Sequence, residues 1–295
     1  MSAQLLQSLL SGLTVGAIYA LVALGFAIIY NASRVINFAQ GEFVMIGGMA
    51  AAVFVDAGLP LPLSVVAAVG LGMAVGLLLE KLAVEPARGA PVVTLIIITI
   101  GASILLRGLA ALVWGKKIRP LPAFSGDAPI VIGGTAGGAT LLPQTLWVLG
   151  TTLAAVAALW WFFNRTLSGK AMLAVSHNRL AAQLVGISVR RVLLVSFGLS
   201  AALGALAGVL IAPISFTAWD VGVMLGLKGF AAAMLGGIGS GPGAVAGGLA
   251  LGLIEALGAG YLSSAYKDVF AFVVLLAALV FLPNGFAGRG AAERV

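Results

Sequence analysis

The stretch "VINFAQGEFVMIGGMAAAVF", residues 35–54, places Asn37, Gln40 and Glu42 between two apolar runs. The run before it, residues 8–30, has the length of a membrane-spanning helix, since about 20 mostly apolar residues cross the hydrocarbon core. The run after it is shorter and rich in glycine. A polar side chain inside a bilayer is costly and usually faces protein or water. The stretch therefore predicts a helical membrane protein with a polar break between its first two helices.

The composition of the whole chain supports this class. Hydrophobic residues make up 61% of the 295 residues and charged residues only 8%, and the mean hydropathy is +1.17. Soluble domains carry about 25% charged residues, so a water-soluble fold is excluded. The net charge of +7 is spread along the chain and forms no nucleic-acid patch. Cysteine is absent, which excludes a disulfide framework and a thiolate metal site.

Apolar segments predict an all-α polytopic bundle with eight or nine membrane segments, forming a single transmembrane domain over residues 1–295. The N-terminal segment lacks the positive charge of a signal peptide and is predicted to be the first spanning helix. The seven segments with the length of a full span lie near 8–30, 62–82, 91–114, 144–163, 191–212, 242–260 and 266–283.

Two shorter glycine-rich segments, near 42–57 and 222–238, are predicted to be broken or re-entrant helices. They also resemble each other, because "GEFVMIGGMAAA" at 41–52 and "KGFAAAMLGGIGS" at 228–240 each carry a phenylalanine followed closely by a glycine pair. The two segments follow helices of opposite predicted direction, which is typical of inverted-repeat transporters. The sequence therefore predicts an inverted repeat.

Basic residues predict the orientation, because short loops rich in Lys and Arg stay in the cytoplasm. The loop 164–190, the 81–90 turn and the tail with Arg289 and Arg294 are basic, which places them and the C-terminus in the cytoplasm. Nine crossings then place the N-terminus outside.

The loop 115–143 falls on the outer side of this count, although it begins with Lys116, Lys117 and Arg119. Its prolines and glycines favour an extracytoplasmic cap with irregular structure or a short hairpin.

Glycine pairs at four-residue spacing recur along the chain. Small residues at this spacing let helix backbones approach closely in lipid, so the pairs predict a compact bundle. They are Gly12 and Gly16, Gly72 and Gly76, Gly204 and Gly208, Gly243 and Gly247, and Gly248 and Gly252.

Enzymatic motifs are largely absent from the sequence. The chain has no G-x-x-x-x-G-K-[ST] motif and hence no phosphate-binding loop of the ATPase type. The stretch "GSGPGA", residues 239–244, fits a dinucleotide-binding pattern by its letters, but no strand is predicted before it. His177 is the only histidine, so a histidine metal cluster is excluded, and we expect it on an exposed helix face. No cofactor or metal is predicted.

Charged residues inside or beside the spans are candidate functional residues, because such charges usually face protein or water. Glu42 and Lys228 flank the two glycine-rich segments and are predicted to line a substrate path, with structural ion pairs as the alternative. For Glu255 a buried pairing partner explains the charge equally well. Arg107 lies near the outer end of its span, where a side chain that reaches the headgroups is the simpler explanation.

The basic loop contains sixteen residues between Gly169 and Gly186 with the composition of a helix but too polar for a span. A single short helix outside the bilayer is predicted there. Two roles remain open, because the helix either anchors the bundle at the interface or docks on a soluble partner.

Three blocks resemble the permease subunits of branched-chain amino acid ABC transporters. They are "GAIYALVALGFAIIYNASRVINFAQGEFVMIG", "AVSHNRLAAQLVGISVRRV" and "KGFAAAMLGGIGSGPGAVAGGLALGLIE", in the expected order. The resemblance implies an importer in the bacterial inner membrane, in which this chain pairs with a second permease, most simply a paralogue. It also implies two cytoplasmic ATP-binding subunits, which explain the missing phosphate loop, and a periplasmic substrate-binding protein. The implied substrates are branched-chain amino acids or similar small polar solutes such as urea and amides.

The basic loop further resembles the coupling motif of ABC importers, which reads Glu-Ala-Ala, three variable residues and Gly. Leu180 stands where the motif has Glu, so the resemblance implies a hydrophobic knob in place of an ion pair. A bulky residue at Ala182 is then expected to uncouple ATP hydrolysis from uptake while the permease stays folded. The residues assigned to the ATPase contact are Arg179, Ala181, Ala182, Gln183 and Gly186.

Two explanations remain open for the opening stretch. Asn37, Gln40 and Glu42 contact a small polar substrate, or Asn37 and Gln40 cap helix ends and satisfy loose backbone groups. The alternative function of the chain is a self-sufficient secondary transporter or channel, which inverted repeats would serve equally well. The short helix in the basic loop favours the importer, because a carrier without partners has no evident need for it.

Overall fold

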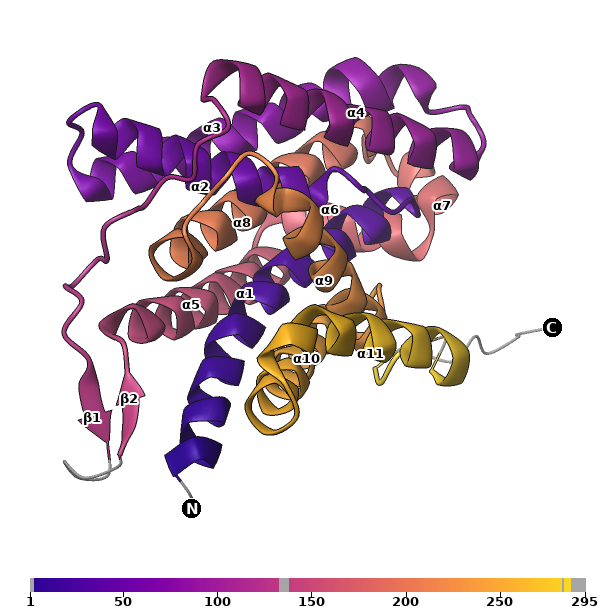
Figure 1. The fold of residues 1–295 in the computed structure, drawn as a ribbon. Helices are drawn as coiled ribbons and strands as arrows, with labels where there is room; N and C mark the ends of the chain where they lie inside the picture. The colour runs from indigo at the N-terminus through magenta and orange to yellow at the C-terminus, as the bar shows by residue number, and fades with distance from the viewer. Residues whose placement is uncertain (1–2, 133–137, 283, 288–295) are drawn as a thin grey trace.

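The computed structural model describes residues 3–132, 138–282 and 284–287 as a bundle of helices with one small hairpin (Figure 1). Within these residues, nine helices run along the bundle. They are α1 (Ala3–Ser33), α2 (Gln40–Asp56), α3 (Leu61–Leu79), α4 (Val92–Val113), α5 (Pro143–Arg165), α8 (Val189–Ser215), α9 (Val221–Gly236), α10 (Gly241–Tyr261) and α11 (Lys267–Phe281).

Seven of these helices are long and apolar enough to cross a membrane, counting the short turns that extend α3 and precede α11. They coincide with the seven predicted spans to within about five residues at each end. The polytopic helical membrane fold is therefore confirmed. A π-helical turn (Glu80–Val84) and a 3₁₀ turn (Glu85–Ala87) follow α3, and a 3₁₀ turn (Ser264–Tyr266) precedes α11.

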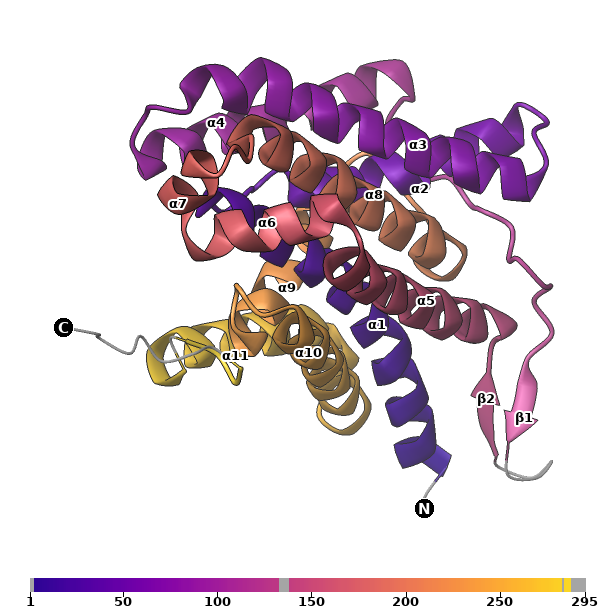
Figure 2. The same ribbon diagram turned by 180° about the vertical axis from the view of Figure 1, so that it is seen from behind.

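Helix α1 lies at the centre of the bundle. Within its spanning window 89% of the residues are buried, compared with 11% for α4 and for α11. Helices α5 and α10 flank α1 when the molecule is seen from behind (Figure 2). Because α1 is surrounded by protein, its many small and aliphatic side chains form the core, whereas α3, α4, α5 and α11 present apolar surface outward.

Contacts between distant loops define one end of the bundle, which also carries the short helices α6 (Leu167–His177) and α7 (Arg179–Leu184). We call it the α6–α7 end. The contacts there are Arg34 Nη2 to the Ser176 carbonyl (2.6 Å), Asn31 Nδ2 to the Gly239 carbonyl (2.9 Å), the Phe286 amide to the Leu235 carbonyl (2.9 Å), and the ion pair of Arg190 with Glu85.

The opposite end carries strands β1 (Ile130–Ile132) and β2 (Ala139–Leu141), and we call it the hairpin end. It lies at the lower left of Figure 1, with the start of α1. The contacts there are Gln4 Nε2 to the Gly260 carbonyl (2.6 Å), the Thr140 amide to Gln7 Oε1 (2.8 Å), Arg119 to Asp56 (2.6 Å), and paired backbones at Arg119 and Thr217.

The two sets of contacts confirm the predicted relation between the loops. The 81–90 turn and the loop 164–190 share the α6–α7 end, while the start of the chain and the loop 115–143 share the hairpin end. The basic residues that begin the latter loop are partly compensated, because Arg119 pairs with Asp56 and the Lys116 ammonium lies 5.5 Å from the centre of the Trp219 ring. Arg289 and Arg294 lie outside the described residues.

Of the two predicted forms of the glycine-rich segments, broken or re-entrant, the broken helix is wrong. Helices α2 and α9 are continuous over 17 and 16 residues. Helix α2 begins beside the middle of α1 and α8, where Gln40 meets Gly25 and Ser200. Seventeen residues of α-helix are about 25 Å long, which is short for a span. Both helices are mainly buried against protein, so they need not match the full thickness of the lipid.

Two other expectations about the loops are resolved. The loop 115–143 contains the short hairpin that was one of its two predicted forms, with β1 antiparallel to β2. The single helix predicted between Gly169 and Gly186 is instead two helices, α6 and α7. The break falls at Asn178, whose extended backbone ends α6 and whose side chain caps α7.

Helix contacts repeat with the pattern of an inverted repeat. Helix α2 packs on α3 and α8, and α9 packs correspondingly on α10 and α1. The pair α1–α10 corresponds to the pair α8–α3, and both pairs meet through small residues. Helices α1 and α8 run in opposite directions between the two ends. The small residues at these two contacts are Gly12, Gly16, Gly248 and Gly252 in one pair and Gly72, Gly76, Ala201 and Ala205 in the other.

Candidate functional site

Glu42 lies where α2 and α9 cross closely. A Cβ atom on Gly226 would lie only 2.8 Å from the Cα atom of Gly41, so the crossing requires glycine. Glu42 is 1% exposed, and its Oε1 accepts a hydrogen bond of 2.8 Å from the Ser103 hydroxyl on α4. Its Oε2 is buried without a hydrogen-bond partner among the described residues. One carboxylate oxygen is therefore left for a ligand.

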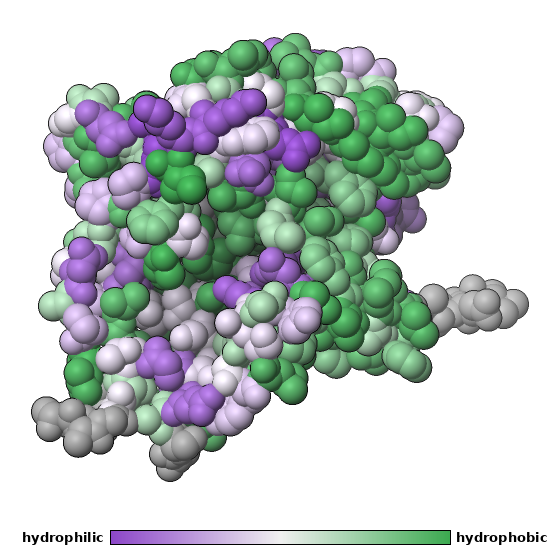
Figure 3. Space-filling model, in the orientation of Figure 1, coloured by the Kyte–Doolittle hydropathy of each residue, from purple (hydrophilic) through white to green (hydrophobic). Residues whose placement is uncertain are grey.

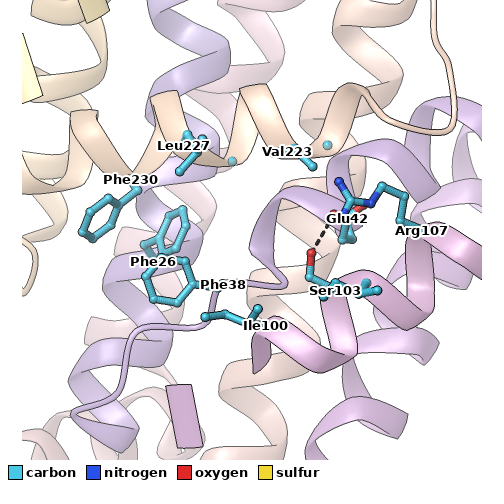
Figure 4. Close-up of a pocket in the computed structure, with 12 residues that line it drawn as sticks. Phe26, Phe38, Glu42, Ile100, Ser103, Arg107, Val223, Leu227 and Phe230 are labelled. Atoms are coloured by element: carbon cyan, nitrogen blue, oxygen red, sulfur yellow. Dashed lines mark hydrogen bonds between the residues drawn. The ribbon is translucent and has the colours of Figure 1, made fainter. Parts of the chain in front are cut away.

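This carboxylate faces a cavity of about 230 Å³ between α1, α2, α4 and α9. Figure 4 shows Glu42, Ser103 and Arg107 together at one end of it. The cavity is smaller than the roughly 300–1,000 Å³ of sites for drug-sized ligands, and so suits a smaller solute. The lining residues are Phe26, Phe38, Glu42, Ile100, Ser103, Ile104, Arg107, Gly222, Val223, Gly226, Leu227 and Phe230.

The other end of the cavity is aromatic. The ring centres of Phe26 and Phe230 are 5.7 Å apart, and those of Phe38 and Phe230 are 6.0 Å apart, both pairs in tilted arrangements. Phe26 comes from α1, Phe38 from the connection to α2, and Phe230 from α9. The cavity thus combines a carboxylate, a hydroxyl and a guanidinium at one end with an aromatic cluster at the other (Figure 4).

Sequence reasoning missed three parts of this cavity: Ser103, the role of Arg107, and the aromatic cluster. The signal for α4 was present, because Ile100, Ser103, Ile104 and Arg107 follow the spacing i, i+3, i+4, i+7 that marks one helix face. Arg107 points toward Glu42 in Figure 4 and lines the cavity, rather than simply reaching the headgroups. The phenylalanines are separated by up to 204 positions and only the fold joins them.

Gln40 has a clear packing role. It is fully buried; its Oε1 accepts a hydrogen bond of 2.6 Å from the Ser200 hydroxyl, and its Nε2 donates to the Ser200 carbonyl at 3.2 Å. The Ser200 hydroxyl also lies 2.8 Å from the Gly25 carbonyl. Gln40 therefore ties α2 to α8 and α1, and it does not line the cavity at Glu42.

Asn37 lies in the turn between α1 and α2 and is also buried. Its Oδ1 accepts a hydrogen bond of 3.1 Å from the Ala39 amide, which supports the start of α2 as a capping residue would. Its Nδ2 has no hydrogen-bond partner among the described residues. Asn37 thus performs a local structural task and retains one free donor, but it does not line the cavity.

Lys228 lies in a group of four charges away from Glu42, of which two are buried and two are about half exposed. Its ammonium is 3.0 Å from Glu255 Oε1 and 2.6 Å from Asp268 Oδ1, and Lys267 lies 3.4 Å from the same Glu255 oxygen. The Tyr19 hydroxyl donates to Glu255 Oε2 at 2.8 Å. Two lysines and two carboxylates balance, so the group joins α1, α9, α10 and α11 without net charge. Glu255 has the buried partner that was one of its two predicted explanations.

Helix α7 has well-defined ends. The Asn178 side chain accepts a hydrogen bond of 3.0 Å from the Ala181 amide at the N-terminus. At the C-terminus, Gly186 adopts a φ of +85°, and the Ile187 amide donates to the Ala182 carbonyl at 3.0 Å. Together with the Gly186 amide on the Gln183 carbonyl, this is a Schellman motif, for which glycine is the preferred residue.

The outward face of α7 is apolar, and Ala182 is not part of it. Leu184 is 80% exposed, and Leu180 and Val185 are also exposed. Arg179, Ala181 and Gln183 are exposed beside them. Ala182 is buried against the core of the chain. A bulky residue at Ala182 would therefore disturb the packing of α7 itself, so the expectation that such a variant leaves the permease folded needs correction.

Among known proteins, residues 8–279 match the family described as "Branched-chain amino acid transport system / permease component". LivH of Escherichia coli (strain K12), a high-affinity branched-chain amino acid transport system permease protein, is 35% identical over 98% of this chain and 97% of that protein. BraD of Pseudomonas aeruginosa, which carries the same description, is 35% identical over 98% of each chain. LsrC of Shigella flexneri, an autoinducer 2 import system permease protein, is 31% identical over 88% of this chain and 75% of that protein.

A solved structure shares the fold at low sequence identity. An inward-facing metal-chelate type ABC transporter superposes with a TM-score of 0.53 and 17% identity, covering 94% of this chain and 87% of that chain. The family match spans nearly all the described helices, including the cavity at Glu42 and the helices α6 and α7. The chain therefore belongs to the branched-chain amino acid transport system permease family.

Proposed function

We propose that the chain forms one half of the membrane path of an ABC importer for branched-chain amino acids or similar small polar solutes. The observation that carries the proposal is the two-ended cavity, with Glu42 and Arg107 at one end and three phenylalanines at the other. Membership of the permease family supports it, as do the descriptions of LivH and BraD. The secondary-carrier alternative gains no support from these relatives.

The cavity offers a complementary group for each part of an amino acid. The ammonium group of the solute pairs with the free Oε2 of Glu42, and its carboxylate pairs with the Arg107 guanidinium. The aliphatic side chain lies against Phe26, Phe38 and Phe230. Each contact replaces part of the solute's hydration in an environment from which bulk water is largely excluded. A single fixed carboxylate and one guanidinium hold such a solute weakly, so that it also leaves.

A second permease completes the path beside α4 and α11. These two helices correspond in the repeat, and each has only 11% of its spanning window buried. Figure 3 shows mainly hydrophobic surface at the upper right and the lower right, where Figure 1 draws α4 and α11. The exposed apolar residues of α4 that adjoin the cavity include Ile100, Ile104 and Leu105. A paralogous permease on this face closes the cavity from the lipid.

The α6–α7 end faces the cytoplasm of a bacterium, where two ATP-hydrolysing subunits bind. Leu180, Leu184 and Val185 form the hydrophobic part of the contact, and Arg179 and Gln183 form its rim. Ala182 and Gly186 hold the shape of α7. The hairpin end then faces the periplasm and receives the solute from a binding protein. The C-terminus lies in the cytoplasm.

Co-expression with the genes adjacent to its own tests this function. We expect the chain to co-purify with ATP-binding subunits, and we expect leucine-loaded binding protein to stimulate ATP hydrolysis in liposomes. A panel with isoleucine, valine, urea and acetamide identifies the substrate. A chain that purifies alone and moves solute down an ion gradient would instead establish a secondary carrier.

A further inference from the structure

A second cavity of about 940 Å³ lies between α1, α5, α6 and α10. It shares no lining residue with the cavity at Glu42. Figure 2 shows α5 and α10 on either side of α1, with α6 beside them at one end. Leu24 and Ile28 of α1 line the cavity, together with Leu159 and Trp160 of α5 and Val245 and Leu249 of α10. This groove is almost wholly apolar.

Water does not stably occupy a groove of this kind, because the lining offers too few hydrogen-bond partners. An empty groove of this size at membrane depth would forfeit the dispersion contacts of every side chain along it. The flanking helices α5 and α10 belong to the spanning set, so the groove opens at the depth of lipid chains. An apolar occupant is therefore required.

The groove becomes polar only toward the α6–α7 end. Asn31, Asn164 and Ser176 line it there. The guanidinium of Arg34 donates to the Ser176 carbonyl at 2.6 Å, which places a cation beside these residues. Arg165 directly follows Asn164 and is exposed.

Lys170 adds a further exposed cation, one turn before the lining residue Leu173 on the same face of α6. The segments that form the groove and its mouth, 17–41, 154–184 and 236–249, contain no Asp or Glu. The mouth is therefore positively charged without a neighbouring carboxylate on these segments.

The indole side chains of α5 mark the level of this mouth. Trp160 and Trp161 lie in the last two turns of the helix and are 63% and 58% exposed. Tryptophan is enriched at the boundary between hydrocarbon and headgroups. The polar mouth is thus at headgroup level and the apolar groove lies below it.

We propose that this groove is a binding site for an anionic phospholipid. Its acyl chains fill the groove between α5 and α10, and its phosphate lies among Arg34, Arg165 and Lys170. Basic pockets between membrane helices bind anionic headgroups through such charges. The charge pattern selects a lipid over a helix of another subunit, because a helix would supply no phosphate for three cations.

Fluorescence quenching by brominated lipid tests the site through Trp160, which lines the groove. The full chain carries four other tryptophans, Trp114, Trp147, Trp161 and Trp219, and phenylalanine replaces each of them. The chain is reconstituted in phosphatidylcholine bilayers with rising amounts of dibrominated phosphatidylglycerol or dibrominated phosphatidylcholine. We expect half-maximal quenching at a mole fraction of phosphatidylglycerol at least fivefold lower, since each basic residue near the headgroup strengthens binding by about fivefold.

Matched variants separate this site from general contact with lipid. Ala246→Phe fills the groove from α10, whereas Ala158→Phe adds the same ring at an exposed position of α5 outside the lining. We expect only the former to abolish the preference for phosphatidylglycerol. Arg165→Gln with Lys170→Gln should weaken that preference at least fivefold, and Lys81→Gln, at an exposed lysine of the same end, should leave it intact.

Two results would overturn the proposal. Equal quenching by both lipids, unchanged by Ala246→Phe, would mean that the groove holds no selected lipid. Absence of quenching by either lipid would mean that protein covers Trp160, including a second copy of this chain.

Discussion

The Lys228 ammonium lies 3.0 Å from Glu255 Oε1, and both residues are at most 5% exposed. These two charges, on α9 and α10, lie deep enough that neither is solvated by bulk water. Asp268 and Lys267 on α11 complete the group from more exposed positions. A weakly packed outer helix is thus held to the bundle by charge as well as by apolar contact.

Lys228→Met should destabilise the protein by about 3 kcal/mol, at the lower end of the range for breaking a buried ion pair. The cost is moderated because Lys267 remains near Glu255. Replacing both members, Lys228→Met with Glu255→Met, removes the buried charges together and should recover most of the loss. Thermal unfolding in detergent gives the comparison. If the losses of stability caused by Lys228→Met and by Glu255→Met simply add in the double variant, the two charges are not coupled.

Gly208→Ala should destabilise the bundle by about 1–3 kcal/mol, because the added methyl group overpacks a close helix contact. An added Cβ on Gly208 would collide with the Val44 carbonyl of α2. Gly108→Ala provides the control, since a Cβ there meets nothing within 4 Å and alanine favours the helix by about 0.5–1 kcal/mol. The midpoints of thermal unfolding should therefore move in opposite directions. Similar midpoints for both variants would contradict the close approach of α2 and α8.

Ser200→Ala should cost about 1–3 kcal/mol, because it leaves the buried Gln40 Oε1 without its donor. We expect the assembled complex to show an unchanged maximal uptake rate once corrected for the amount of folded protein. This outcome would assign Gln40 to packing. A fall in the corrected rate would assign Gln40 to the path instead.

Leu184→Asp should weaken binding of the ATP-hydrolysing subunits at least tenfold, because it puts a charge in the centre of the apolar face of α7. The permease itself should keep its thermal stability, since Leu184 is 80% exposed. Ala182→Trp, at a buried position, should instead lower that stability. The yield of co-purified ATP-hydrolysing subunits measures the binding, and thermal unfolding of the isolated chain measures the stability. Undiminished co-purification of Leu184→Asp would exclude this face as the contact.

Much of the fold was predictable from hydropathy, because each full span carries its own signal of length and composition. The continuity of α2 and α9 was not, since their glycines resemble helix breaks in the sequence and serve close helix crossings in the fold. The division of the basic loop at Asn178 was also missed, although Asn before a short helix is a recognised cap. Local capping competes with helix continuation, and sequence alone does not decide between them.

Of the candidate site, Glu42 was predictable because a carboxylate in a membrane segment is rare. Lys228 carried the same signal, yet its charge serves a buried pair with Glu255. The difference depends on which helices are neighbours, and α9, α10 and α11 meet only in the folded chain. Ser103 and Arg107 shared a helix face in the sequence, but their relation to Glu42 depends on the packing of α4 beside α2.

Uptake of leucine by the reconstituted complex with Glu42→Gln tests the central claim most directly. The change keeps the shape of the side chain and removes the charge that pairs with the solute. Charge-assisted hydrogen bonds contribute about 1.5–3 kcal/mol, so we expect uptake at low leucine concentration to fall at least tenfold. Glu80→Gln, at a buried carboxylate outside the cavity that pairs with Arg88, should have a much smaller effect once uptake is corrected for the amount of folded protein. Normal uptake by Glu42→Gln in a correctly assembled complex would contradict a solute path along this cavity.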